Sequence, residues 1–95
     1  MSAYVIVDIK VKDPIRYEEY KKMAEATVKQ FGGKYIVRGK PAEILEPGWT
    51  PNRLVILEFP SVEQAKLWWN SDEYAEAKRL RYETADSIMI VVEGI

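Results

Sequence analysis

The stretch that decides the fold reads Glu58-Phe59-Pro60-Ser61-Val62-Glu63-Gln64-Ala65-Lys66-Leu67-Trp68-Trp69-Asn70-Ser71-Asp72-Glu73-Tyr74. Its first residues close an apolar segment, which predicts a strand over Arg53–Phe59. Ser61, with Gln64 three residues later, is a capping box and predicts a helix to about Asn70. Ser71 then caps a second helix that extends to about Arg81, with an acidic first turn and a basic last turn.

The residues before this stretch predict another strand and a long helix. Residues 3–11 alternate in polarity and are rich in β-branched side chains, but both faces carry apolar residues. Asp13-Pro14 is a strong helix start, and Gly32-Gly33 ends the helix after about Phe31. Its apolar stripe consists of Tyr17, Tyr20, Ala24, Thr27, Val28 and Phe31.

Between the two helical regions we expect a broken strand. Residues 34–38 alternate, whereas Gly39 and Pro41 predict a bulge or kink near a sheet edge. The strand is expected to resume over residues 43–46 and to be followed by a loop over residues 47–52. The final strand is expected over Asp86–Glu93.

The order β-α-β-β-α-β, with the second helix divided in two, predicts one domain over residues 1–95. Its class is α+β and ferredoxin-like: a four-stranded antiparallel sheet with the helices on one face. Right-handed crossovers give the spatial order fourth, first, third, second strand. Because the strands are apolar on both faces, the open sheet face predicts a partner, and two sheets packed face to face would form a homodimer. The alternative is an open face that is merely half-exposed to water.

Composition excludes several classes of protein. The 95 residues include no cysteine and no histidine, which removes disulfides, thiolate sites, the commonest metal ligand and the usual general base. No calcium-loop pattern or other metal-ligand cluster occurs, and no phosphate-binding glycine loop. The formal net charge of −1 provides no basic surface for nucleic acid or membrane lipids. We therefore expect a cytoplasmic protein without metal or cofactor; no signal sequence or membrane-spanning run is apparent.

A set of short motifs across the whole chain carries a family resemblance. They are Val37-Arg38-Gly39-Lys40, Arg53, Glu58-Phe59-Pro60-Ser61, Ala65, Trp68-Trp69, Ser71, Glu73-Tyr74, Lys78, Arg81 and Val92-Glu93-Gly94. In these the chain resembles the bacterial family catalogued as domain of unknown function 1330. The resemblance implies the dimeric α+β barrel fold, which hosts monooxygenases, haem-degrading enzymes, lyases and stress-response proteins, with the pocket between helices and sheet. It implies no particular reaction. The family usually has glycine where this chain has Lys40.

Charged residues that interrupt apolar strands are the first candidates for a site. Asp8, Arg38 and Glu58 are predicted to lie on adjacent strands, and the register near Gly39 determines whether they share a face. A buried carboxylate could act as an acid or base, and Arg38 could bind an anion. The alternative is that these residues form ion pairs or protect the sheet edge.

Further candidates lie in the deciding stretch. Arg53 could bind a carboxylate or phosphate, or could pair with Glu46 across the hairpin. Tyr74, Lys78 and Arg81 share one face of the last helix and could form an anion site, although Lys78 is better explained by the helix dipole.

The tryptophans are divided between core and surface. Trp69 is expected to continue a buried stripe with Val62 and Ala65, while Trp68 would line a pocket or a dimer contact. Trp49, in the loop, is expected to cover a pocket or contact a partner.

Two functions remain open. The first is a small-molecule enzyme or binding protein without a cofactor, whose anionic or carbonyl-containing ligand contacts a set of candidate residues: Arg38, Arg53, Glu58, Trp69, Tyr74 and Arg81. The second is a non-catalytic homodimeric interaction or regulatory module.

Overall fold

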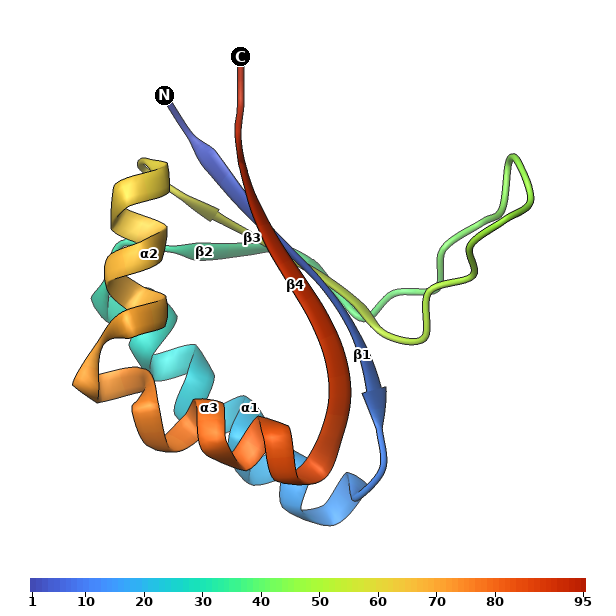
Figure 1. Cartoon of the computed structure of the whole chain (residues 1–95), viewed down its shortest axis with the longest axis horizontal. Helices are drawn as coiled ribbons and strands as arrows, with labels where there is room; N and C mark the ends of the chain where they lie inside the picture. Colours follow the sequence, from blue (N-terminus) through green and yellow to red (C-terminus); the bar gives the residue numbers. More distant parts are fainter.

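The computed structural model describes residues 1–95 and contains four strands and three helices. In chain order they are β1 (Ala3–Val11), α1 (Pro14–Gln30), β2 (Lys34–Arg38), β3 (Leu54–Phe59), α2 (Val62–Asn70), α3 (Asp72–Thr84) and β4 (Ala85–Glu93). The strands form one antiparallel sheet in the order β2-β3-β1-β4. All three helices lie on one face of this sheet (Figure 1). The predicted ferredoxin-like α+β fold and its strand order are therefore confirmed.

The core lies between the helices and one face of the sheet. Along β1 every second side chain, from Ala3 to Ile9, is buried against the helices. The alternate residues point to the open face, where Tyr4 and Ile6 are only half-buried. On β4 the open-face residues Ile88 and Ile90 are exposed. The two-sided apolar pattern thus reflects a core on one side and an unpartnered apolar face on the other.

Short polar side chains begin each helix as predicted. Asp13 accepts a hydrogen bond from the backbone N–H of Arg16, and Ser71 accepts one from that of Tyr74. Ser61 accepts one from the backbone of Gln64, but the reciprocal half of the capping box is absent. Instead, the Gln64 amide donates to the carbonyl of Phe31, at the end of α1. The side chain therefore joins α2 to the end of α1 rather than closing its own turn.

The predicted assignment of the two tryptophans is wrong. Trp68 is the buried one, 1 % exposed, and its indole N–H donates to Thr27 Oγ1 over 3.0 Å. Trp69 is 37 % exposed and lies under the ammonium group of Lys78, 3.7 Å from the ring centroid. Trp68 and Trp69 follow Ala65 by three and four residues, so helical spacing alone allows either on its face. In the structure the buried residues of α2 are Ala65 and Trp68.

The break in β2 differs from the prediction in position and extent. The register shifts between Tyr35 and Val37, so the bulge lies at residue 36 rather than at Gly39. No strand forms over residues 43–46, because the whole segment 39–53 lies outside the sheet. We call this segment the arm. Figure 1 shows the arm projecting from the sheet on the side away from the helices.

The base of the arm is bound by the backbone of β1, where the Ile9 N–H donates to the Arg53 carbonyl over 2.9 Å, and by one side chain of the open face. Asp8, on β1, accepts hydrogen bonds from the Trp49 indole over 3.1 Å and from the backbone N–H of Asn52 over 2.8 Å. The carboxylate of Asp8 therefore has a structural role here.

None of the three helices is long and apolar enough to cross a membrane.

Candidate functional site

A small cavity of about 30 Å³ lies between the helices and the sheet. Most of its lining is aromatic or aliphatic, with three basic side chains and no acidic one. The lining residues are Val7, Ile9, Tyr17, Tyr20, Lys21, Ala24, Val28, Tyr35, Arg38, Arg53, Val55, Leu57, Trp68 and Met89. This lining combines apolar walls with cationic groups, a composition typical of sites for small anionic molecules.

A pair of tyrosines joins α1 to α3 beside this cavity. The hydroxyls of Tyr20 and Tyr74 lie 2.9 Å apart, and both side chains are buried. The Tyr74 ring packs on Trp68, with centroids 4.2 Å apart, and the Tyr20 ring packs on Tyr17 at 5.3 Å. Burial and the adjoining Tyr74 hydroxyl raise the pKa of Tyr20 well above its usual value. Tyr20 is therefore a neutral hydrogen-bonding group at physiological pH.

Arg81 extends this polar cluster and is the most unusual charged residue of the chain. It is 2 % exposed; its Nε–H donates to the Tyr74 hydroxyl over 3.4 Å, and its Nη1 donates to Ser87 Oγ. Burial acts to lower the pKa of Arg81, but Tyr74 and Tyr20 outweigh it and the pKa is raised. The guanidinium is thus charged, and yet no carboxylate pairs with it.

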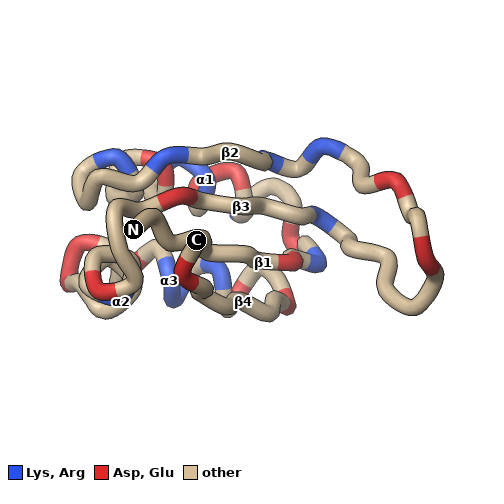
Figure 2. The backbone as a smooth tube through the Cα atoms, turned by 90° about the horizontal axis from the view of Figure 1, so that it is seen from above, with Lys and Arg blue, Asp and Glu red and all other residues tan.

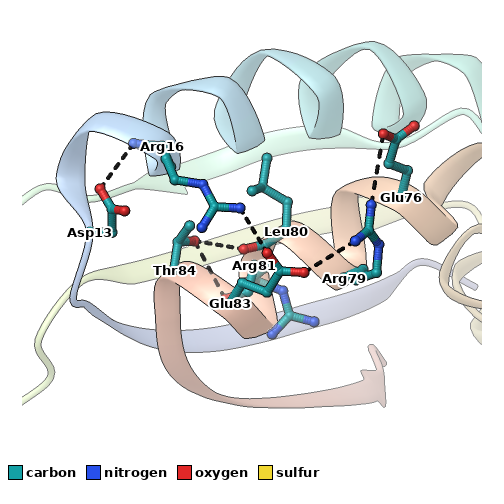
Figure 3. A network of polar contacts seen from close by, with 8 residues as sticks. All are labelled: Asp13, Arg16, Glu76, Arg79, Leu80, Arg81, Glu83 and Thr84. Atoms are coloured by element: carbon teal, nitrogen blue, oxygen red, sulfur yellow. Dashed lines mark hydrogen bonds and ion pairs between the residues drawn. The ribbon is translucent and has the colours of Figure 1, made fainter.

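Two acidic residues of α3, Glu76 and Glu83, belong to a different network. Figure 3 shows Glu83 joined to Arg16 and Arg79, with Glu76 also bound to Arg79, and no line from a carboxylate to Arg81. These pairs lie on exposed side chains, where ion pairs contribute about 0–1 kcal/mol each. The hydrogen-bond partners of Arg81 are therefore neutral hydroxyls, and its guanidinium carbon also lies 5.0 Å from the centre of the Tyr82 ring.

Arg53 lies on the same side of the sheet, directly before β3. Its guanidinium carbon is 5.9 Å from the centre of the Tyr17 ring, and its Nε is buried without a hydrogen-bond partner. It forms no ion pair, so the alternative of a bond to Glu46 is wrong. The guanidinium packs on Gly39, where an added Cβ would lie 2.2 Å from Nη1. With a φ of 76°, Gly39 is required both by its backbone conformation and by this close approach.

Arg38 occupies the mouth of the cavity. Its guanidinium carbon lies 4.2 Å from the Tyr35 ring centre, and its Nη2 pairs with Glu25 Oε2 at 3.1 Å. Burial raises the pKa of Tyr35 to about 12, although Arg38 opposes the shift. Lys21, half-buried and paired with Glu18, completes the rim. Arg38 and Glu25 are both partly exposed, so the pair can open to solvent.

The bulge at residue 36 decides which predicted residues meet. It places Arg38 opposite Val55, whose side chain faces the helices. Asp8 and Glu58 point to the open face, so the three charged residues do not share a face. Hydrogen bonding with Ser2, and then with Lys34, lowers the pKa of Glu58. Glu58 is therefore an ionised, partly exposed carboxylate outside the cavity.

Of the predicted residues, Arg38 and Arg53 line the cavity, Tyr74 and Arg81 belong to the cluster that joins it through Tyr20, and Glu58 and Trp69 lie outside both. Lys78 also lies outside and donates to the carbonyl of Trp69. The prediction missed Tyr17, Tyr20 and Tyr35, which the sequence pattern assigns to the core. Their hydroxyl groups on an otherwise apolar stripe were the available signal, because a buried hydroxyl needs a partner.

Comparisons with known proteins agree with this architecture. The model of the family described as "Domain of unknown function (DUF1330)" matches residues 2–95. The comparison with curated proteins gives no match. Among solved structures, RPA0582 of Rhodopseudomonas palustris, described as a protein of unknown function, has a TM-score of 0.79 at 18% identity, covering 99% of this chain and 82% of the other.

Two further solved structures have the same fold. SnoaB of Streptomyces nogalater, described as a cofactor-independent oxygenase, has a TM-score of 0.72 at 8% identity, covering 99% of this chain and 93% of the other. A dimeric protein of unknown function from Bacteroides fragilis has a TM-score of 0.64 at 20% identity, covering 98% and 96%. At these identities the likeness concerns the fold.

Proposed function

The chain belongs to the DUF1330 family, and from its interior site we propose that it binds a small anionic or carbonyl-containing molecule between the helices and the sheet. The observation that carries the proposal is the state of Arg81: a buried guanidinium with neutral hydrogen-bond partners and no carboxylate. An ion removed from water costs several kcal/mol unless a counter-charge compensates it. An anionic oxygen would supply that counter-charge.

Arg53, which lines the cavity itself, supports the same conclusion. Its buried Nε–H has no acceptor, although buried donors are almost always paired. A guanidinium offers five donors in a planar arrangement that matches a carboxylate or an enolate oxygen. With Tyr17 nearby, Arg53 would contribute a donor and an aromatic surface to the same ligand.

The cavity must enlarge to accept such a ligand. Its 30 Å³ accommodates about one water molecule, whereas small-molecule sites usually measure roughly 300–1,000 Å³. The mouth lies at β2, a five-residue edge strand with a bulge, where the partly exposed Arg38–Glu25 pair bridges to α1. We therefore place entry at β2, with Arg38 released from Glu25 as the ligand arrives.

The groups present limit what a reaction here could be. No acidic side chain lines the cavity, and the chain contains no histidine or cysteine. The tyrosines Tyr17, Tyr20 and Tyr35 have raised pKa values because they are buried, so they do not act as bases at neutral pH. A transformation without a cofactor would thus need a substrate that loses its own proton readily, with Arg53 and Arg81 stabilising its anion.

The second part of the proposal is a homodimer through the open sheet face. The Bacteroides fragilis neighbour and a ferredoxin-like one from Jannaschia are both described as dimeric. Ile88, Ile90 and Val92 form an exposed apolar row along β4, next to the half-buried Ile6 of β1. Apolar surfaces of this kind mark interaction sites. A dimer that serves only as an interaction module is the second candidate function, and this face is the observation that favours it.

A thermal-shift screen tests ligand binding directly. Small carboxylates and 1,3-dicarbonyl compounds at millimolar concentration should raise the melting temperature, since a ligand at about 100 times its Kd stabilises by roughly 2.7 kcal/mol. Arg81→Met should abolish the shift, because it removes the buried cation and keeps the apolar volume. Arg79→Met, an exposed arginine of the same helix, is the matched control and should retain the shift. A shift of equal size in Arg81→Met would contradict the proposal.

A further inference from the structure

A second hollow, an apolar groove of about 270 Å³, lies between α2 and the outer edge of β4. Trp68 and Val91 line it, and Trp69 and Ile90 also contribute. Trp68 and Met89 line the interior cavity as well, so they form the wall between the two sites. The proposed ligand site therefore does not account for this groove.

Unpaired basic groups border the groove. Lys66 belongs to its lining, and Lys78 lies over the Trp69 ring and donates to the Trp69 carbonyl. Neither lysine is among the residues that form ion pairs in this chain. An occupant with apolar side chains next to carboxylates would complement both features.

The arm carries such a segment at its far end. Its sequence Glu43-Ile44-Leu45-Glu46 places two adjacent apolar residues between two acidic ones. Leu45 is 96 % exposed and Ile44 about half exposed, and neither glutamate forms an ion pair. Figure 2 shows the acidic positions far along the arm, away from the body of the molecule.

The arm of one molecule is not placed to reach its own groove. The arm projects from the sheet on the side away from the helices, whereas α2 forms one wall of the groove (Figure 1). The arm and α2 also lie at opposite ends of the sheet (Figure 1). A second copy offers a different arrangement. Because of this placement (Figure 1), a two-fold axis that faces two sheets with antiparallel strand directions would direct each arm towards the α2 end of the partner.

We propose that the tip of the arm, Ile44–Leu45, docks in the groove between α2 and β4 of a second copy, with Glu43 and Glu46 meeting Lys66 and Lys78. This inference rests on the proposed homodimer and is independent of ligand binding. Each half of the arm has roughly seven residues and spans up to about 23 Å, enough to cross the edge of a facing sheet. By two-fold symmetry the contact occurs twice in each dimer.

Cysteine cross-linking tests the contact, because the chain has no cysteine of its own. Leu45→Cys and Lys66→Cys proteins are purified separately, mixed under mild oxidation and separated on a non-reducing gel. A disulfide-linked pair of the two different variants is expected. Ile15→Cys, an exposed position on α1, replaces Lys66→Cys in the control and should give no cross-link with Leu45→Cys.

Charge exchange provides the second measurement. Glu46→Lys and Lys66→Glu should each raise the dimer Kd by about threefold to tenfold, and the double variant should recover most of the loss. A dimer that forms no 45–66 cross-link would overturn the docking of the arm while leaving the homodimer intact. A chain that sediments as a monomer would overturn both. Neither result would change the outcome of the ligand screen.

Discussion

The interior of this small domain retains a charged side chain that its own residues do not neutralise. Arg81 reaches Tyr74 and Ser87, both neutral, and the Tyr74 hydroxyl is shared with Tyr20. Hydrogen bonds from a charged group contribute about 1.5–3 kcal/mol each, which offsets only part of the several kcal/mol that burial costs. The cluster therefore lowers the free energy of unfolding in the absence of a ligand, and a bound anion would recover that free energy.

The buried tyrosines determine how the stability of the fold depends on pH. Burial raises the pKa of Tyr20, Tyr17 and Tyr35 in the folded state above the unfolded value of about 10. Below about pH 10 the stabilising contribution is fully present, because these groups are protonated in both states. As the pH rises from 10 towards the folded pKa, which is about 12 for Tyr35, the unfolded chain ionises first and stability falls.

Urea denaturation between pH 8 and pH 11 measures this effect. We expect a flat free energy of unfolding up to about pH 10, then a decline approaching about 1.4 kcal/mol per pH unit for each such tyrosine. Tyr20→Phe should reduce the slope of this decline by the contribution of one tyrosine. Tyr82→Phe, which alters an exposed ring, is the matched control. A free energy that stays constant to pH 11 in the wild type would contradict the assignment of these tyrosines.

At the residue scale the sequence predicted only part of the site. Helical spacing placed Tyr74 and Arg81 on one face, and their hydrogen bond confirms it. The side to which Arg38 points was not predictable, because it depends on a one-residue bulge and each slip in a strand reverses the face. The Arg53 guanidinium, whose Nε has no hydrogen-bond partner, packs closely on Gly39. Gly39 lies fourteen residues earlier in the chain, and no local sequence pattern indicates this contact.

At the scale of elements, local signals predicted the helices and strands well and the segment between β2 and β3 poorly. Caps at Asp13, Ser61 and Ser71 define helix starts through side-chain oxygens close in sequence. Residues 43–46 have strand-like polarity but face no neighbouring strand, so the pattern alone could not form one. Strand formation requires a partner, and the arm leaves the sheet before it could pair.

Asp8 is the side chain of β1 that binds the arm, next to a backbone hydrogen bond from the Ile9 N–H to the Arg53 carbonyl. Asp8→Ala removes the acceptor for both Trp49 and Asn52, so the base of the arm should open more often. Loss of these hydrogen bonds should lower the free energy of local opening of the arm by about 1–3 kcal/mol. This predicts roughly fivefold to hundredfold faster cleavage by chymotrypsin at Trp49. Mass spectrometry of the fragments during limited proteolysis measures the rate.

The matched control for the arm is Asp86→Ala, which removes an exposed carboxylate of β4 that pairs with Lys12. Cleavage of this variant at Trp49 should match that of the wild type. If Asp8→Ala is cleaved no faster than the control, Asp8 does not hold the arm.

The whole molecule presents two unlike faces of one sheet. One face is covered by three helices and contains the site, while the other carries apolar side chains and is bordered by the arm (Figure 1). The sequence predicted this asymmetry, because β1 and β4 are apolar on both sides and the helices cover only one. The cytoplasmic location stays a prediction.

A charge on the open face should separate the proposed dimer without unfolding the chain. Ile88 is 68 % exposed on β4 and contributes little to the core of a single molecule, so Ile88→Asp should keep its circular dichroism spectrum. In a two-fold dimer the substitution buries two unpaired carboxylates, each at a cost of a few kcal/mol, which predicts a dimer Kd at least about a hundredfold higher. Ile15→Asp is the matched control, because it makes the same substitution at a position of α1 that is 83 % exposed. It changes the net charge equally and should leave the dimer Kd unchanged. Sedimentation velocity at protein concentrations of roughly 1 to 100 µM distinguishes monomer from dimer, because this range covers the Kd values that we expect. If Ile88→Asp sediments as a dimer throughout, the interface does not bury this position of β4, and the proposed contact through Ile88, Ile90 and Val92 is wrong.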